Sequence, residues 1–291
     1  MLEFKYHPFS RVKESEVLQF VGRYPWKPHW LSEHIKEFIQ LLTSSTDLIF
    51  DLHNKNDRIA IAVLIDKIKN KGNNACLEVL ALDQRYDVYM IYQYLIESAK
   101  QKLPITRSGI EVTIHESLTK LNDLLVQEGF NSYYDIFEMM VDLSTLEHIK
   151  INEISLLQPE DFVECYDVIG LSFKDNPEMA IPDYEEWEKS RRTSDSQIWV
   201  YKDNRKIVGF VNNMIDVQDQ KAEIRSVGVL PSYRGKGLGR KLLLNSLSYF
   251  VNKGVSTCHL TVATKNRKAL HLYEDIGFQV NDIFKVYYWN R

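Results

Sequence analysis

The sequence predicts a mixed α/β protein built from two copies of one domain plan. Strand-like runs of alternating apolar and polar residues are interleaved with helix-like runs, in which apolar residues recur every three or four positions. The dipeptide Gly-Phe ends a helix-like run at Gly129-Phe130 and again at Gly277-Phe278, an offset of 277 − 129 = 148 residues. At this offset the apolar positions and turns of the two halves keep in step, although few residues are identical. A single long offset indicates a duplicated domain, because solenoid repeats span about 20–50 residues.

The second half shows which residues predict each element. Pro159 suits the first turn of a helix, and apolar residues after it recur on one helical face. The pair Asp203-Asn204 between two strand-like runs predicts a hairpin, and Gly254 suits the position just after a helix. In chain order, the expected elements are a strand at 151–157, helices at 159–173 and 184–192, strands at 197–201, 205–215 and 222–230, a helix at 237–253, a strand at 257–263, a helix at 266–276 and a strand at 284–290.

This order combines a hairpin-built antiparallel part with a parallel βαβ part, so the expected fold class is α/β with a mixed sheet. The duplication also sets the expected domain limits. We predict one domain over residues 1–147 and a second over 148–291, with the boundary in the polar stretch near 144–151.

Composition and charge exclude several classes of protein. The 291 residues are 44% hydrophobic and 12% aromatic, which is typical of globular proteins, and the net charge is −4. A mildly acidic chain lacks the basic field that nucleic-acid binding needs. No run approaches the ~18 apolar residues of a membrane span, and the first residues contain no apolar leader segment. Cys76, Cys165 and Cys258 are too dispersed for a disulfide framework or metal site. We therefore expect a cytoplasmic protein with no metal, nucleic-acid or membrane partner.

One loop of the second half carries most of the predicted chemistry. Residues 234–240, RGKGLGR, join a strand-like run to a helix-like run. Glycines permit positive φ and close approach of a ligand to the backbone, and the N–H groups of a first helical turn favour an anion. Three basic residues add positive charge, so the loop predicts a phosphate site and favours a diphosphate. Neither the GxxxxGK[ST] pattern nor the GxGxxG pattern fits the glycine spacing.

The loop motif R-x-x-G-x-G after V-x-P resembles the signature of the GNAT superfamily of acyl-CoA-dependent N-acyltransferases. A second block, from Asn266 to Phe278, is similar to the family pattern N-x-x-A-x-x-x-Y-x-x-x-G-F. The resemblance covers about residues 151–291. It implies a mostly antiparallel sheet flanked by helices, with two central parallel strands that splay apart. Together with the duplication, it implies two tandem GNAT-like domains, a layout that resembles mycothiol-synthase-like acetyltransferases.

The resemblance implies acetyl-CoA as the co-substrate. The diphosphate of CoA would lie on the amides of 235–240, and its pantetheine would lie between strands 223–229 and 257–263. Backbone N–H groups on the first of these strands would hold the developing oxyanion. The implied cofactor-binding residues are Val227, Gly228, Val229, Arg234, Gly235, Lys236, Gly237, Leu238, Gly239, Arg240, Asn266 and Tyr273.

Tyr273 and Glu223 are the expected catalytic residues. In the family, the tyrosine at this position often lies near the CoA sulfur and protonates the leaving thiolate, and a phenol with a pKa of ~10 is a competent donor. Core packing is the alternative for Tyr273. Glu223 is the nearest carboxylate on the strand that leads to the loop. It is the candidate base, with an ion pair to Arg225, or deprotonation through water, as alternatives. Asn266 caps its helix, contacts the cofactor, or does both.

The first half keeps the apolar pattern without these residues. At the same offset residues 234–239 of the loop become residues 86–91, YDVYMI, with no glycine and no cation. Asn266 and Tyr273 correspond to Leu118 and Leu125. Our hypothesis is that residues 1–147 form a degenerate GNAT-like domain without a cofactor motif, which supports the active domain, shapes its acceptor cleft and stands in for a dimer partner.

The function predicted from these features is transfer of an acetyl group from acetyl-CoA to a primary amine by direct attack. A non-catalytic acyl-CoA-binding protein or sensor, and a transferase of a longer acyl group, are the alternatives. The loop would contact only the CoA part of the ligand and therefore does not identify the acceptor. A small-molecule amine and a peptide amine are both compatible with the sequence. A monomer and a homodimer are both compatible with the sequence.

Overall fold

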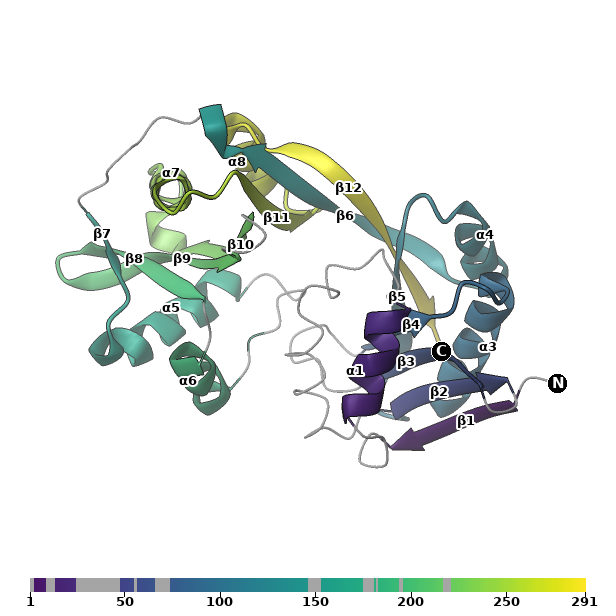
Figure 1. The fold of residues 1–291 in the computed structure, drawn as a ribbon. Coiled ribbons are helices and arrows are strands. Elements are labelled where there is room, and N and C mark those ends of the chain that lie inside the picture. Colours follow the sequence, from purple (N-terminus) through teal and green to yellow (C-terminus); the bar gives the residue numbers. More distant parts are fainter. Residues whose placement is uncertain are drawn as a thin grey trace. The chain divides into compact units, whose positions relative to one another are not determined.

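The computed structural model describes residues 3–8, 14–24, 48–54, 57–65, 74–145, 153–174, 181, 183–193, 196–216 and 221–291 (Figure 1). The chain divides into two compact units. Unit 1 contains Met1–Asp135 and Ile283–Arg291, and unit 2 contains Ile136–Asp282. Each unit contains a mixed sheet with helices on its faces, so the predicted mixed α/β fold is confirmed.

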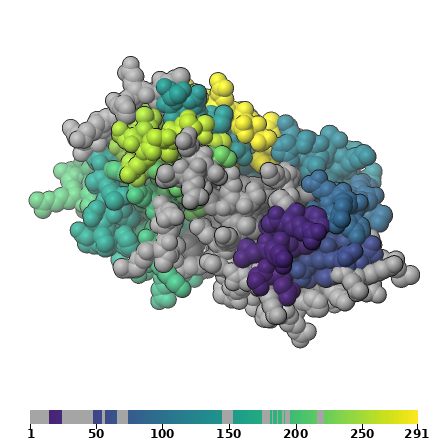
Figure 2. Space-filling model, in the orientation of Figure 1, coloured from purple at the N-terminus to yellow at the C-terminus, as the bar shows by residue number. Residues whose placement is uncertain are grey.

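Unit 1 has the strand order β1-β2-β3-β4-β5-β12. Its pairs are antiparallel except for β4 with β5, which is parallel. Helices α3 and α4 pack on one face of the sheet and α1 on the other; α1 is the purple surface segment in Figure 2. The elements are β1 (Glu3–Pro8), α1 (Glu14–Arg23), β2 (Leu48–Asn54), β3 (Asp57–Ile65), β4 (Asn74–Leu82), α3 (Val88–Lys102), β5 (Gly109–His115), α4 (Thr119–Gln127) and β12 (Gln279–Asn290).

Unit 2 has the strand order β6-β11-β10-β9-β8-β7, in which only β10 with β11 is parallel. Helices α7 and α8 bury their apolar sides against one face of the sheet, and α5 and α6 against the other. The elements are β6 (Asn131–Asp142), β7 (Ile154–Leu156), α5 (Phe162–Phe173), α6 (Tyr184–Thr193), β8 (Gln197–Asp203), β9 (Lys206–Asp216), β10 (Lys221–Val229), α7 (Leu238–Asn252), β11 (Thr257–Ala263) and α8 (Arg267–Ile276).

The elements of the second half follow the predicted order, with small differences at their ends. The helix expected from Pro159 begins with a 3₁₀ turn, and its α-helical part starts at Phe162. The hairpin predicted from Asp203-Asn204 is present. Its turn is centred one residue later, because Asn204 and Arg205 adopt the positive φ values of 48° and 68° that a tight two-residue hairpin needs.

The final strands of the two halves are exchanged between the units. β6 and β12 lie 148 residues apart in the duplication, and each follows a Gly-Phe pair. Residues 136–142 of β6 pair with β11 in unit 2, whereas residues 284–290 of β12 pair with β5 in unit 1. The boundary between the two units therefore differs from the boundary between the two sequence repeats. The sequence-based domain limits, 1–147 and 148–291, stay a prediction.

The central parallel strands of unit 2 separate part-way along their length. β10 and β11 are paired only from Lys221 with Thr257 to Glu223 with His259, although both strands continue beyond that level. A bulge follows in β10, between Ile224 and Ser226, and bulges add local bend and twist. In unit 1 the parallel pairing of β4 and β5 also ends before the strands do. The predicted splay of the central strands is confirmed in both units.

Candidate functional site

The loop between β10 and α7 shows why its three glycines are needed. Gly235 and Gly237 have φ values of +76° and +77°, which side chains rarely adopt, and a Cβ at either position would meet open space. Gly239 has a different role, because a Cβ there would lie 3.2 Å from Cδ2 of Leu272 in α8. The first two glycines therefore shape the backbone of the loop, and the third lets α7 pack closely on α8.

Helix α7 begins without a side-chain cap. Gly237 occupies the N-cap position and has no side chain that could accept a hydrogen bond. The first hydrogen bond of the helix runs from Lys241 N to Gly237 O over 3.1 Å. The N–H groups of 238–240 precede it, where no carbonyl of the helix can accept from them. This end of the helix carries partial positive charge beside an exposed loop, which fits the diphosphate of a CoA ester.

The basic residues of the loop also make contacts within the protein. Arg234 donates from Nη2 to Ser172 O over 2.8 Å and from Nε to Val229 O over 3.2 Å, which ties the last turn of α5 to the end of β10. Arg240 Nη1 donates to Asp275 O over 3.3 Å, near the end of α8. Lys236 Nζ lies 4.7 Å from the centre of the Tyr233 ring. Arg234 and Arg240 therefore have structural roles, and their predicted contacts with a diphosphate stay predictions.

The backbone of β10 turns hydrogen-bonding groups toward the gap between the splayed strands. Leu230 N donates to Val208 O over 2.9 Å, so in this antiparallel register Gly228 also directs its N–H toward β9. The alternation then directs the N–H groups of Val227 and Val229 to the opposite side, toward β11. They lie beyond the level at which pairing with β11 ends. Two main-chain donors therefore face the position predicted for the pantetheine and the thioester.

Gly228 allows α5 to approach this strand. A Cβ at Gly228 would lie 2.4 Å from Cε1 of Phe210 and 2.9 Å from Cβ of Ser172. Any side chain here would push α5 away from β10 and would disturb the carbonyl of Ser172 that holds Arg234. The predicted site residue Gly228 is thus required by crowding rather than by φ.

Tyr273 and Asn266 both lie on α8, as expected. Tyr273 is 7% exposed, and its ring lies in the apolar cluster against which Val227 and Val229 also pack. Burial raises the pKa of Tyr273 to about 12, so the phenol keeps its proton at neutral pH. Asn266 Oδ1 accepts a hydrogen bond from Ala269 N over 3.3 Å, which makes it the N-cap of the helix. A cofactor contact for Asn266 stays a prediction.

Glu223 lies at the last paired level before β10 and β11 separate. Its Oε2 is 3.3 Å from Arg225 Nε, so the ion pair considered from the sequence is present. The two side chains are 34% and 21% exposed, which leaves the carboxylate accessible. A role for Glu223 as the base stays a prediction.

Two further side chains at this level were not assigned a role from the sequence. His259 is the register partner of Glu223 on β11, and its Nδ1 lies 3.3 Å from Oε1 of Glu138 on β6. The neighbouring position of His259 follows from pairing two predicted strands. Glu138 comes from the first half of the chain, and no local pattern in the sequence places it here.

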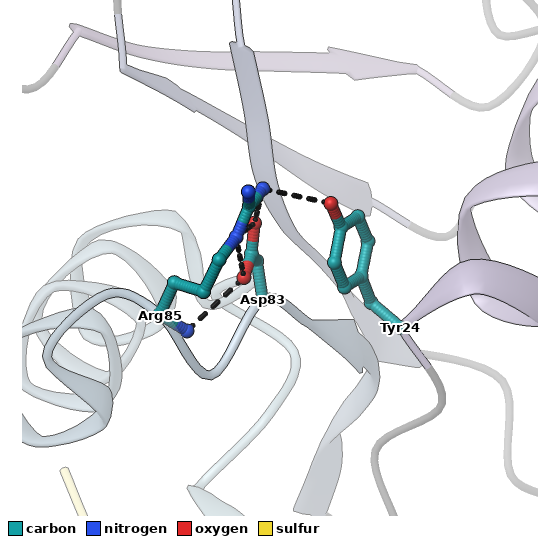
Figure 3. Close-up of polar contacts among 3 residues, drawn as sticks. All are labelled: Tyr24, Asp83 and Arg85. Carbon is teal, nitrogen blue, oxygen red and sulfur yellow. Dashed lines mark hydrogen bonds and ion pairs between the residues drawn. The ribbon is translucent and has the colours of Figure 1, made fainter.

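In unit 1 the turn after β4 is closed by an internal ion pair (Figure 3). Asp83 is 1% exposed and accepts hydrogen bonds from Nε and Nη2 of Arg85, while Arg85 Nη2 also donates to the Tyr24 hydroxyl over 2.8 Å. The hydrogen bond from Arg85 holds the pKa of Asp83 below its usual value, so the carboxylate stays ionised at neutral pH.

The helix that follows this turn starts with a side-chain cap, unlike α7. Asp87 Oδ1 accepts hydrogen bonds from the N–H groups of Tyr89 over 2.9 Å and Met90 over 3.4 Å. A carboxylate of the chain itself thus binds the first-turn amides of α3. Its negative charge opposes a phosphate at this position.

Residues 160–278 match the profile of the family described as "Acetyltransferase (GNAT) family". The chain carries a GNAT domain. This domain begins at residue 160, just before α5, and ends at residue 278, just after α8. It therefore lies within unit 2 and includes the loop and both splayed strands. The resemblance inferred from the two sequence blocks is confirmed.

Relatives and solved structures extend the likeness beyond the GNAT domain. A mycothiol acetyltransferase of Thermomonospora curvata is 28% identical over 181 residues, which are 59% of this chain and 61% of the relative. A ribosomal protein bS18-alanine N-acetyltransferase of Haemophilus influenzae is 38% identical over 88 residues, which are 30% of this chain and 57% of the relative. The matched part of the chain thus spans less than two thirds of either relative.

Among solved structures, a tandem GNAT protein from the clavulanic acid biosynthesis pathway has a TM-score of 0.71 at 13% identity. The similarity covers 100% of this chain and 98% of the other. The predicted tandem GNAT fold is confirmed over the whole chain.

Among the helices that the structure describes, none combines the length and the hydrophobicity that a membrane span requires.

Proposed function

We propose that the protein is an N-acetyltransferase that moves the acetyl group of acetyl-CoA to a primary amine by direct attack. The observation that carries this proposal is that unit 2 contains both the uncapped start of α7 and the part of β10 that is not paired with β11. The glycine loop precedes α7, and Val227 and Val229 direct their N–H groups into the gap beside it. The names of the curated relatives support acetyl as the transferred group and an amine as its acceptor.

In this proposal the amides of 235–240 hold the diphosphate of CoA, and the edge of β10 binds the pantetheine. Gly235 and Gly237 keep side chains away from the diphosphate, and the open space beside both positions fits such a group. An N–H of Val227 or Val229 then donates to the thioester carbonyl oxygen. Donors fixed in a backbone stabilise the negative charge that develops on that oxygen without having to reorganise.

The chemistry needs one base and one acid. The amine nitrogen forms a bond to the acetyl carbon, the carbon–sulfur bond breaks, and CoA leaves as a thiolate. Glu223 takes the proton that the amine loses, directly or through water, and Tyr273 gives its proton to the thiolate. Burial raises the pKa of Tyr273 to about 12, so the phenol holds its proton at neutral pH and gives it up only to the strongly basic thiolate that forms as the carbon–sulfur bond breaks.

Thiol release tests the proposal against its alternatives. The protein is mixed with acetyl-CoA and a panel of amino sugars, polyamines, amino acids and peptides with a free N-terminus, and free thiol and acetylated amine are measured. We expect multiple turnovers that depend on one class of amine. Stoichiometric binding of acetyl-CoA without turnover would identify an acyl-CoA-binding protein or sensor, and faster turnover with longer acyl-CoA esters would identify a different acyl donor.

We further propose that only the second half binds acetyl-CoA. The carboxylate of Asp87 already binds the first turn of α3, and the corresponding turn in unit 1 contains no glycine. Calorimetric titration should therefore give one site per chain. Neutralising the cap with Asp87→Asn should leave this stoichiometry unchanged, because the amide oxygen of Asn can still accept from the N–H groups of Tyr89 and Met90. Two equivalent sites in the wild-type chain would contradict the degenerate character of the first half.

A further inference from the structure

A row of ionisable side chains crosses three neighbouring strands of unit 2. Glu223 on β10 is the register partner of His259 on β11. On β6, Met140 pairs with His259 and Glu138 pairs with Thr261, so Glu138 lies diagonally beside His259. The residues next to this row along their strands point into the core beneath α7 and α8: Ala222, Ile224, Cys258, Leu260 and Met139. By alternation, Glu223, His259 and Glu138 share the opposite face of the sheet.

The contact between His259 and Glu138 determines which ring nitrogen of the imidazole carries the proton. Nδ1 of His259 lies 3.3 Å from Oε1 of Glu138, and both side chains are about a quarter exposed, at 23% and 24%. An ionised carboxylate can only accept, so Nδ1 carries the proton. In the neutral ring, Nε2 then holds a lone pair and can take up a second proton. Asn281 Nδ2 approaches the same carboxylate oxygen at 3.5 Å and helps to hold it in place.

Glu138 reaches this site through the exchange of strands. It belongs to the first half of the sequence, yet residues 136–142 of β6 complete the sheet of unit 2. The exchanged strand in unit 1 carries Val286 at the matching level, opposite Thr113, and Glu111 stands where unit 2 has His259. The acid–imidazole pair is thus found in the unit that carries the glycine loop and is replaced in the unit whose loop is closed.

We propose that Glu223, His259 and Glu138 form a proton relay for the attacking amine, with Glu138 as a positioning residue supplied by the first half. This inference rests on the proposed acetyltransferase function. An N–H bond of the ammonium breaks and the proton passes to Glu223, and from there to Nε2 of His259. The imidazolium is stabilised by the carboxylate of Glu138 and then loses its proton to water. Neighbouring strands lie about 4.8 Å apart, so the side chains of Glu223 and His259 can reach each other.

The first half of the chain therefore supplies a residue of the proposed relay, Glu138, in addition to supporting the second half. An imidazole titrates closest to neutral pH among the side chains, which suits a group that must hold a proton briefly and release it. Two other charged groups adjoin the row. Arg225 on β10 lies 3.3 Å from Glu223, and Asp282 on β12 accepts a hydrogen bond from Asn281, the residue that contacts Glu138.

The test compares Glu138→Gln, His259→Gln and Glu223→Gln. Gln keeps the shape of Glu138 and an acceptor for Nδ1 but removes the charge that stabilises the imidazolium. We expect Glu138→Gln to lower kcat about tenfold and to alter the acid limb of kcat/KM for the amine. His259→Gln should lower kcat on the order of 10²-fold and remove that limb. All three variants should bind acetyl-CoA with wild-type affinity, which also reports that unit 2 is folded.

The chain offers a matched control. His271 Nδ1 lies 3.3 Å from Glu274 Oε2 on the exposed side of α8, the same separation as in the proposed pair. Glu274→Gln should leave kcat and the pH profile unchanged. A wild-type pH profile in His259→Gln or in Glu138→Gln would overturn the relay.

An NMR measurement of the His259 ring separates this inference from the function on which it rests. The resonance is assigned from its loss in His259→Gln, and the measurement needs no substrate. The nitrogen shifts of the ring report which nitrogen carries the proton of the neutral imidazole, and the contact with Glu138 predicts Nδ1. A wild type that turns over no amine but carries this proton on Nδ1 would contradict the proposed function alone. A neutral ring with the proton on Nε2 would contradict the pair itself.

Discussion

Replacing Tyr273 with Phe is expected to lower kcat for amine acetylation on the order of 10²–10⁴-fold, with little change in the affinity for acetyl-CoA. The hydroxyl is the proposed proton donor to the leaving thiolate, and the ring fills the core beneath β10, so Phe keeps the packing and removes only the proton. Rapid-quench measurement of one turnover, together with calorimetric binding of acetyl-CoA, gives the two quantities separately.

The pH dependence of the same reaction supplies a second check. Burial raises the pKa of Tyr273 to about 12, so its proton is retained as the pH rises through the neutral and mildly alkaline range. The wild-type enzyme should therefore show no alkaline loss of kcat from this residue below about pH 11.

Tyr287→Phe is the matched control for Tyr273→Phe. Tyr287 is also buried, lies in unit 1, and donates its hydroxyl to Asn122 Oδ1 over 2.9 Å. Its loss should cost about 1 kcal/mol of stability and leave kcat unchanged. A Tyr273→Phe enzyme with wild-type kcat, or a Tyr287→Phe enzyme with an equal loss, would show that the hydroxyl of Tyr273 is not the acid.

Much of the second half could be predicted because its signals are local. The φ requirement at Gly235 and Gly237, the cap at Asn266 and the left-handed Gly254 depend on a few neighbouring residues, and all were readable from sequence spacing. The contacts of Arg234 were not readable in this way. Its guanidinium binds carbonyl groups from α5 and β10, which meet only after the fold has formed.

The strand exchange marks the limit of prediction from this sequence. β6 and β12 occupy equivalent places in the duplication and both follow a Gly-Phe turn, so either could complete either sheet. The apolar pattern that sets the register of a strand does not state which copy of the sheet it joins. Glu138 therefore could not be placed beside His259 until the pairing of β6 with β11 was known.

Replacing Gly237 with Val is expected to weaken acetyl-CoA binding by about 10²-fold, with a smaller loss of stability. A residue other than glycine at a φ of +77° costs about 1–2 kcal/mol, and relief of this strain would turn the first-turn amides away from the diphosphate. Losing one or two hydrogen bonds to a charged group removes about 3 kcal/mol, which corresponds to about 10²-fold in Kd. Calorimetric titration of acetyl-CoA and thermal unfolding measure the two effects.

Gly254→Val distinguishes the role of Gly237 in diphosphate binding from the general effect of backbone strain at an end of the same helix. Gly254 follows the other end of α7, has a φ of +75° and, like Gly237, would place a Cβ in open space. Both substitutions should therefore lower the thermal midpoint by a similar amount, because they force the same backbone conformation on a β-branched residue. Only Gly237→Val should weaken acetyl-CoA binding, since Gly254 is a full helix length from the loop. Equal losses of affinity would mean that strain in α7 controls binding, and wild-type affinity in Gly237→Val would mean that the diphosphate is not held at this end of the helix.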